Sequence, residues 1–182
     1  MLKTIAAIVV VLVAGVLAYA ATRPDTFRVE RTARVQAPPE KIFALISDLH
    51  RWESWSPYEK KDPAMRKTYS GAASGTGATF EWDGNGDVGK GRLSITDTSP
   101  PSRVAMRLEM LKPFEARNVV EFTIKPDGHA TDVTWGMHGP MPYVSKVLSV
   151  FIDMDRMVGK DFEAGLASLK AVAEGTPPRA GS

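Results

Sequence analysis

A long amphipathic segment near the C-terminus constrains the fold of this chain more than any other feature. From Tyr143 to about Glu174, apolar side chains recur at helical spacing, which predicts a helix of about eight turns with one broad apolar face. The apolar positions are Val144, Leu148, Phe151, Val158, Phe162, Leu166, Leu169 and Ala173. A helix with such a face is stable only when that face is covered, so the rest of the chain has to supply a large apolar surface.

The segments before this helix predict a sheet. Residues 27–36 alternate apolar and polar side chains, which is typical of a half-buried strand. Further short segments of strand character, several of them bounded by turn residues, lie at 79–82, 92–96, 104–111, 117–124 and 132–138. We therefore expect an α+β protein in which one curved antiparallel sheet is crossed by the long helix.

Two short helices are expected after the first strand. Pro38 and Pro39, followed by Glu40, are typical of a helix N-terminus, and an apolar stripe at helical spacing follows. The stripe consists of Ile42, Leu45, Ile46 and Leu49, and Trp52 continues it by one turn. A second short helix is expected after Asp62 and Pro63.

The N-terminus is strongly apolar. The run from Thr4 to Ala21 carries no charge and would extend roughly 27 Å as a helix, close to the thickness of a bilayer core. An uncleaved membrane anchor is one interpretation; a secretory signal cleaved near Ala20 is the other, since Ala18-Tyr19-Ala20 has the form of a cleavage site. An anchor with so short an N-terminal tail favours an extracytoplasmic domain, and a cleaved signal would give a secreted or periplasmic one.

Composition and motifs exclude several classes of site. The chain has no cysteine, so disulfides and thiolate metal sites are impossible. The net charge of +2 comes without any long basic run, which argues against nucleic-acid binding. Gly84 to Gly89 has dinucleotide-motif spacing but precedes a strand, so a glycine-rich hairpin is the better interpretation. The three histidines share no metal-ligand spacing, and neither a metal nor a cofactor is expected.

One acidic residue interrupts the apolar face of the long helix. Winding this helix at 100° per residue places Asp155 near the centre of the apolar stripe, between Phe151 and Val158. A carboxylate on a buried face is costly unless it is paired. It therefore pairs with a basic group such as Arg31, caps loop amides at the sheet rim, or lines a pocket between helix and sheet and contacts a ligand.

Aromatic residues and methionines are more numerous than a thin two-layer core requires. Together they suit an adaptable apolar pocket between sheet and helix, although each one alone is compatible with ordinary core packing. With Asp155 and the inward-facing Asn118, the candidate cavity residues are Trp52, Trp55, Trp82, Met106, Asn118, Phe122, Trp135, Met137, Phe151 and Asp155.

Four segments resemble the START-like superfamily of polyketide cyclases/dehydrases and lipid-transfer proteins. They are VERTARVQAPPEKIFALISDLHRWESWSPY, GAASGTGATFEW, VTWGMHG and FIDMDRMVGKDFEAGLASLK. The resemblance implies a helix-grip fold, in which about seven antiparallel strands wrap around the C-terminal helix and enclose an apolar cavity. It also implies that the segment with Trp52 and Trp55 forms part of the cavity rim. No catalytic motif is shared across the superfamily, so no catalytic residue is carried over.

The expected organisation follows from these features. Residues 1–22 form the anchor or signal, 27–174 the helix-grip domain and 175–182 a disordered tail. The expected function is binding or carriage of a small hydrophobic ligand, such as a lipid, quinone or polyketide, by a domain held at the membrane through residues 4–21. The alternatives are a cyclase or dehydrase that uses Asp155 or His138 for proton transfer, and a closed interaction domain without a ligand.

Overall fold

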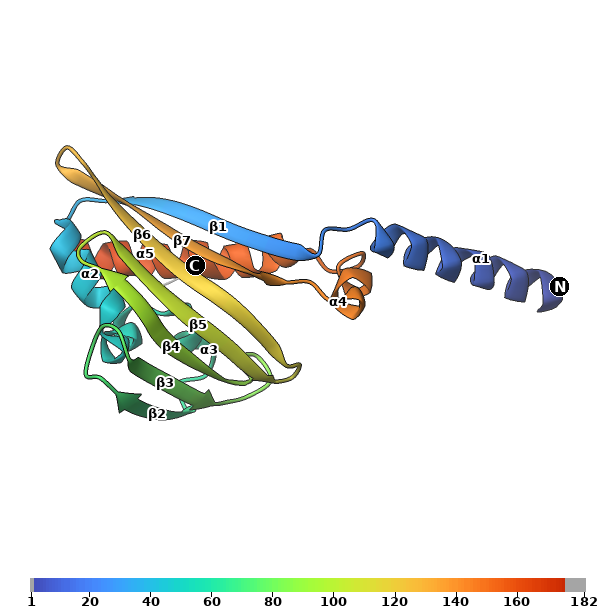
Figure 1. The fold of residues 1–182 in the computed structure, drawn as a ribbon, viewed down its shortest axis with the longest axis horizontal. Coiled ribbons are helices and arrows are strands. Elements are labelled where there is room, and N and C mark those ends of the chain that lie inside the picture. The colour runs from blue at the N-terminus through green and yellow to red at the C-terminus, as the bar shows by residue number, and fades with distance from the viewer. Residues whose placement is uncertain (1, 176–182) are drawn as a thin grey trace.

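The computed structural model describes residues 2–175, which form an N-terminal apolar helix and an α+β domain (Figure 1). The helices are α1 (Leu2–Ala21), α2 (Pro39–Ser47), the 3-10 helix η1 (Leu49–Ser54), α3 (Pro57–Lys61), α4 (Tyr143–Leu148) and α5 (Met154–Glu174). The strands are β1 (Thr26–Val35), β2 (Arg66–Gly71), β3 (Ala78–Asp83), β4 (Lys90–Ser99), β5 (Arg103–Lys112), β6 (Ala116–Asp127) and β7 (Ala130–Pro140).

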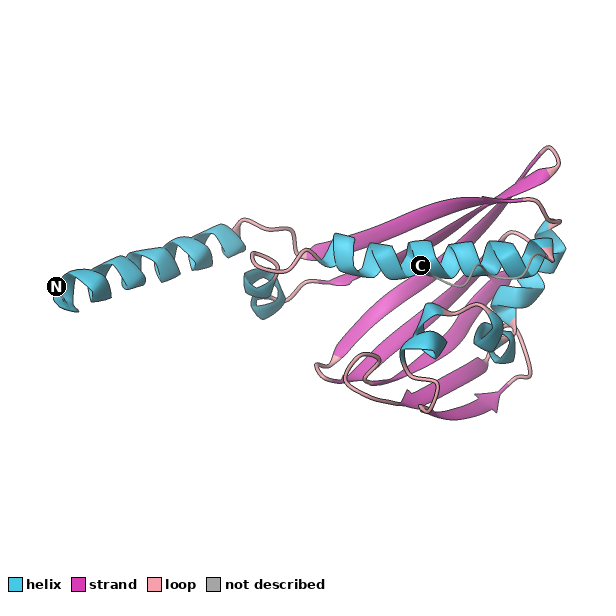
Figure 2. Ribbon diagram, turned by 180° about the vertical axis from the view of Figure 1, so that it is seen from behind, coloured by secondary structure: helices cyan, strands magenta, loops and turns pink. Residues whose placement is uncertain are grey.

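The seven strands form a single antiparallel sheet in the order β1-β7-β6-β5-β4-β3-β2. Figure 2 shows α5 crossing in front of this curved sheet, with α3 beside it on the same face. Alternation along the strands gives the sheet one buried face: Val29 and Val35 of β1 are buried, whereas Arg28 and Arg34, each one residue earlier, are exposed. The α+β class and the helix-grip architecture are confirmed.

The prediction of a single long helix from Tyr143 is wrong, because the chain forms two helices separated by residues 149–153. Asp153 begins α5 as its N-cap, and its carboxylate accepts a hydrogen bond from the backbone N–H of Arg156. Phe151 lies in the break and is 73% exposed. The apolar side chains before the break therefore do not share the buried face that Phe162 and Leu169 form in α5.

The second short helix also differs from expectation. It lies before Asp62 and not after it. Helix α3 begins at Pro57, directly after its N-cap Ser56, because proline is well tolerated in the first turn of a helix. Residues 66–71, which no alternation pattern predicted, form the edge strand β2, which pairs with β3 alone. Of the tail predicted to be disordered, only Gly175 lies within the described residues. It ends α5 in the left-handed conformation, with φ of 71°.

The strand register places several chain segments at one end of the sheet. Thr26 pairs with Pro140, and Met110 pairs with Ala116, so the start of β1, the end of β7 and the β5–β6 hairpin lie at this end. Helix α1 projects from the same end, which we call the α1 end (Figures 1 and 2). The β6–β7 turn at Gly128 lies at the opposite, distal end.

Candidate ligand-binding site

The concave face of the sheet brings most of the predicted site residues together. Trp135 stacks on Phe162 of α5 with 4.2 Å between ring centroids and lies 4.9 Å from Phe122. Trp52 and Trp55, 4.7 Å apart, pack edge-on against both Phe122 and Trp135. Met106 and Met137 are buried on the same face. The centre of the face is therefore a packed aromatic core.

Trp52 and Trp55 support helix α2. Their indole N–H groups donate to the carbonyls of Ile46 (2.9 Å) and Leu45 (3.1 Å), which belong to the last turn of α2 and lack partners within the helix. The two side chains are 7% and 1% exposed, so they lie inside the core. The expectation that they form part of a cavity rim is corrected by this burial.

Trp135 differs from these two tryptophans in one respect. Its Nε1 is the single buried side-chain nitrogen or oxygen among residues 2–175 that has no hydrogen-bond partner. An indole nitrogen can only donate, and a buried donor without a partner costs about 1–3 kcal/mol. An acceptor oxygen placed beside this ring would remove that cost.

The α1 end of the concave face is less completely covered than its centre. Inward-facing side chains there are half-buried: Phe27, Trp82, Leu108, Met110 and Asn118. Helix α5 packs mainly along β1, and α2 packs against β5 and β6, which leaves these positions at the margin of the helical layer. Apart from Asn118, this is an apolar surface in contact with solvent.

Asn118 is the polar group of this surface. A Cβ on Gly139 of the neighbouring strand would lie 2.2 Å from its Oδ1, so the glycine leaves room for the amide to lie across β7. Within the part of the chain that the structure describes, the amide makes no hydrogen bond. Sequence reasoning selected Asn118 and Trp82 here but not Phe27 or Leu108, although strict alternation along β1 and β5 could have found both.

Asp155 does not face the interior, which corrects the prediction based on a continuous helix. It lies in the first turn of α5, and both of its oxygens accept hydrogen bonds at 3.0 Å from the Arg31 guanidinium. The hydrogen bond from Arg31 lowers the pKa of Asp155, and the bonds to Asp155 and then Glu163 raise the pKa of Arg31. The proposed pairing with Arg31 is confirmed. Phe151 is likewise displaced from the interior.

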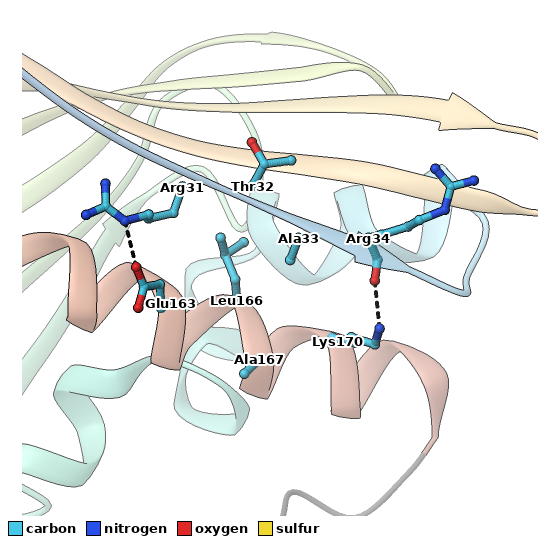
Figure 3. A pocket seen from close by; sticks show the side chains of 8 residues that line it. All are labelled: Arg31, Thr32, Ala33, Arg34, Glu163, Leu166, Ala167 and Lys170. Carbon is cyan, nitrogen blue, oxygen red and sulfur yellow. Dashed lines mark hydrogen bonds and ion pairs between the residues drawn. The ribbon is translucent and has the colours of Figure 1, made fainter.

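Two surface pockets occur away from this region. The larger, about 420 Å³, lies between β1 and α5, where Arg31 and Glu163 face each other and Lys170 reaches the carbonyl of Arg34 (Figure 3). The smaller, about 160 Å³, lies beside η1 and includes His50 stacked on Tyr69. Both are lined largely by polar or small side chains, and neither includes a predicted site residue. His138 points away from the concave face and is exposed.

These features define a helix-grip domain with an aromatic core and an apolar, incompletely covered end. The sequence profile described as "Polyketide cyclase / dehydrase and lipid transport" matches residues 26–174. The chain therefore belongs to the polyketide cyclase/dehydrase and lipid transport family. No curated protein sequence matches it.

Solved structures with the same fold are distant in sequence. Protein CV1439 from Chromobacterium violaceum is 16% identical with a TM-score of 0.57, and the match covers 83% of this chain and 99% of that protein. The Aha1 dimer from Colwellia psychrerythraea is 18% identical with a TM-score of 0.55, covering 81% and 96%. The di-domain ARO/CYC StfQ from the steffimycin biosynthetic pathway is 13% identical with a TM-score of 0.61, covering 82% of this chain and 52% of StfQ. At these identities the likeness shows the fold alone.

The N-terminal helix has the dimensions of a membrane span. Residues Lys3–Ala21 form one helix that is long and apolar enough to cross a bilayer, and almost all of it is exposed. A signal sequence would pass the same test of length and composition.

Proposed function

We propose that this protein binds a small hydrophobic ligand on the concave face at the α1 end. The observation that carries the proposal is the set of half-buried apolar side chains there: Phe27, Trp82, Leu108 and Met110 remain in contact with solvent although they face inward. A molecule covering them would gain roughly 25 cal/mol for each Å² of apolar surface removed from water. The family description, which includes lipid transport, agrees with such a ligand.

The polar groups of the face suggest what else the ligand carries. The Asn118 amide offers a donor and an acceptor at the open margin, and the Trp135 N–H offers a donor in the core. We infer a mainly apolar ligand with at least one oxygen acceptor, such as a quinone, a polyketide or a lipid. Hydrophobic sites with a few placed polar groups are typical of small-molecule binding.

The same proposal includes membrane attachment through α1, with the domain outside the cytoplasm. Ala20 is completely buried, and the end of α1 packs against α4. A helix whose last turn packs against the domain agrees with an anchor that is retained.

Binding accounts for the geometry better than proton-transfer catalysis does. The two groups considered for catalysis lie outside the proposed site: Asp155 is paired with Arg31 on the surface, and His138 faces the opposite side of the sheet. A general acid or base has to lie within hydrogen-bond reach of the reacting group.

The test is to compare what co-purifies with the full-length protein and with two variants. Leu108→Trp would fill the α1 end of the concave face, whereas Arg107→Trp places the same side chain on the exposed convex face of the same strand. All three proteins would be purified in one detergent and their solvent extracts compared by mass spectrometry. A compound present with wild type and Arg107→Trp but lost with Leu108→Trp supports the proposal; identical extracts from all three contradict it.

A further inference from the structure

The domain exposes an unusual number of large apolar side chains at the α1 end. The set comprises Phe114, Val144, Leu148, Phe151, Ile152 and Met157, which we call the apolar patch. Phe114 is 74% exposed, Phe151 73% and Val144 71%. Soluble domains rarely expose several such residues close together unless the surface has a partner.

The patch comes from segments far apart in sequence that the fold places at one end. Phe114 lies in the β5–β6 hairpin, and the other five residues lie in α4, in the break after it and in the first turn of α5. In both ribbon views, α4 and this hairpin lie on the side from which α1 projects (Figures 1 and 2). The aromatic core at the centre of the sheet does not need any of these side chains.

Helix α4 is attached to the end of α1 by specific contacts. The Tyr143 hydroxyl donates to the carbonyl of Leu17 at 2.8 Å. Lys146, whose side chain is buried, donates to Asp25 in the linker at 2.6 Å, and the N–H of Met141 donates to the carbonyl of Asp25 at 2.7 Å. These contacts keep α4 beside the C-terminal turn of α1.

This attachment determines the depth of the patch if α1 crosses a bilayer. Leu17 lies four residues before the end of α1, a rise of roughly 6 Å. Tyr143 and Tyr19 are then at the level where the span leaves the hydrocarbon, which is where membrane proteins concentrate tyrosine. A short helix with exposed Val144 and Leu148 at that level would lie at the membrane surface.

We propose that the apolar patch inserts into the outer part of the same bilayer that α1 spans, so that the α1 end of the concave face opens toward lipid. This inference rests on the proposed anchoring and extends it: the ligand would be a molecule dissolved in the membrane, reaching Leu108 and Asn118 without crossing water. The occupant of the patch is the lipid itself rather than a second protein.

Depth-dependent fluorescence quenching tests this directly, because the chain contains no cysteine. The variants Phe151→Cys and Phe114→Cys, each labelled with an environment-sensitive fluorophore, would be reconstituted as full chains in phosphatidylcholine vesicles containing phosphatidylglycerol. His129→Cys at the distal β6–β7 turn is the aqueous control, and Leu12→Cys in the middle of α1 reports whether the helix spans. Nitroxide-labelled lipids are the quenchers.

The expected result is blue-shifted emission and strong lipid quenching at positions 151, 114 and 12, with water-like emission at 129. If lipid quenching occurs only at position 12, and positions 151 and 114 behave like position 129, the insertion of the patch into the bilayer is wrong and the anchoring by α1 stands. Water-like emission at 12 would overturn the anchoring and the inference together. A blue shift at 151 without lipid quenching would mean that protein covers the patch, which also contradicts the inference.

Discussion

The close approach of α5 to the sheet gives the most quantitative prediction, through Gly165. A Cβ at this position would lie 2.6 Å from Cζ3 of Trp135 and 3.0 Å from Cδ of Pro57, whereas carbon atoms in contact are normally about 3.5–4.0 Å apart. Trp135 cannot simply move, because its ring is stacked on Phe162 and contacts three further aromatic rings. Helix α5 is therefore expected to shift away from the core in Gly165→Ala.

Two opposing effects decide the size of the change. Replacing glycine by alanine in a helix favours folding by about 1 kcal/mol. Overpacking a rigid core costs about 1–3 kcal/mol, and the upper end applies here because a stacked ring and a proline are the neighbours. We expect a net destabilisation of about 2 kcal/mol, measured as a lower midpoint of urea unfolding by tryptophan fluorescence.

Two variants of the same helix serve as controls. Ala164→Gly, at an exposed position, should lose about 1 kcal/mol from helix propensity alone. Gly159→Ala should also lose stability, since its Cβ would overlap the Arg31 guanidinium, which would have to give up its hydrogen bonds to Asp155 and Glu163 to make room. A Gly165→Ala protein as stable as wild type, alongside the expected loss for Ala164→Gly, would refute the reasoning.

Two further predictions concern the hydrogen bonds of the domain. Trp52→Phe removes a hydrogen-bonded donor and leaves the Ile46 carbonyl without a partner, whereas Trp135→Phe removes a donor that has no partner. Trp52→Phe should therefore destabilise the fold by about 1–3 kcal/mol more than Trp135→Phe. Equal losses of stability in chemical denaturation would contradict this difference in hydrogen bonding. The pKa of Asp155 is lowered in the folded state, so its contribution to stability is present above the ordinary value of 3.8 and is lost as the pH falls through the lower folded value. Asp155→Asn should therefore reduce the loss of stability on acidification; an unfolding midpoint that depends on pH as steeply as in wild type would show that the pair contributes nothing.

Local patterns alone were sufficient for much of the fold. Alternation along β1, β5, β6 and β7 depends only on which side chains avoid water, and this property is readable from the chain. The apolar stripe of α2 and the long apolar N-terminal run are equally local. The aromatic residues of the candidate site were found in the same way, because large apolar side chains at inward positions have to meet in the core.

Tertiary contacts decided the features that the patterns misjudged. Helical periodicity runs through residues 149–153, but only the fold shows that the Asp153 cap divides the segment and that Phe151 has no surface to cover. Periodicity places Asp155 on a buried face because it treats the segment as one continuous helix. The ion pair with Arg31 of β1 shows where the carboxylate lies. The roles of Trp52 and Trp55 depend on the carbonyls of α2 that they reach, which no sequence spacing reveals.

The apolar patch shows the same difference between what local sequence patterns predict and what tertiary contacts determine. Val144, Leu148 and Phe151 of the patch fit the apolar stripe that the sequence predicts, since hydrophobicity and local spacing do not show which surfaces stay uncovered. Only the three-dimensional arrangement shows that α4 and the β5–β6 hairpin both lie at the end from which α1 projects. The sequence by itself determined the elements and their apolar faces, whereas long-range packing determined which faces are covered by the protein and which remain exposed, because burial depends on partners distant along the chain.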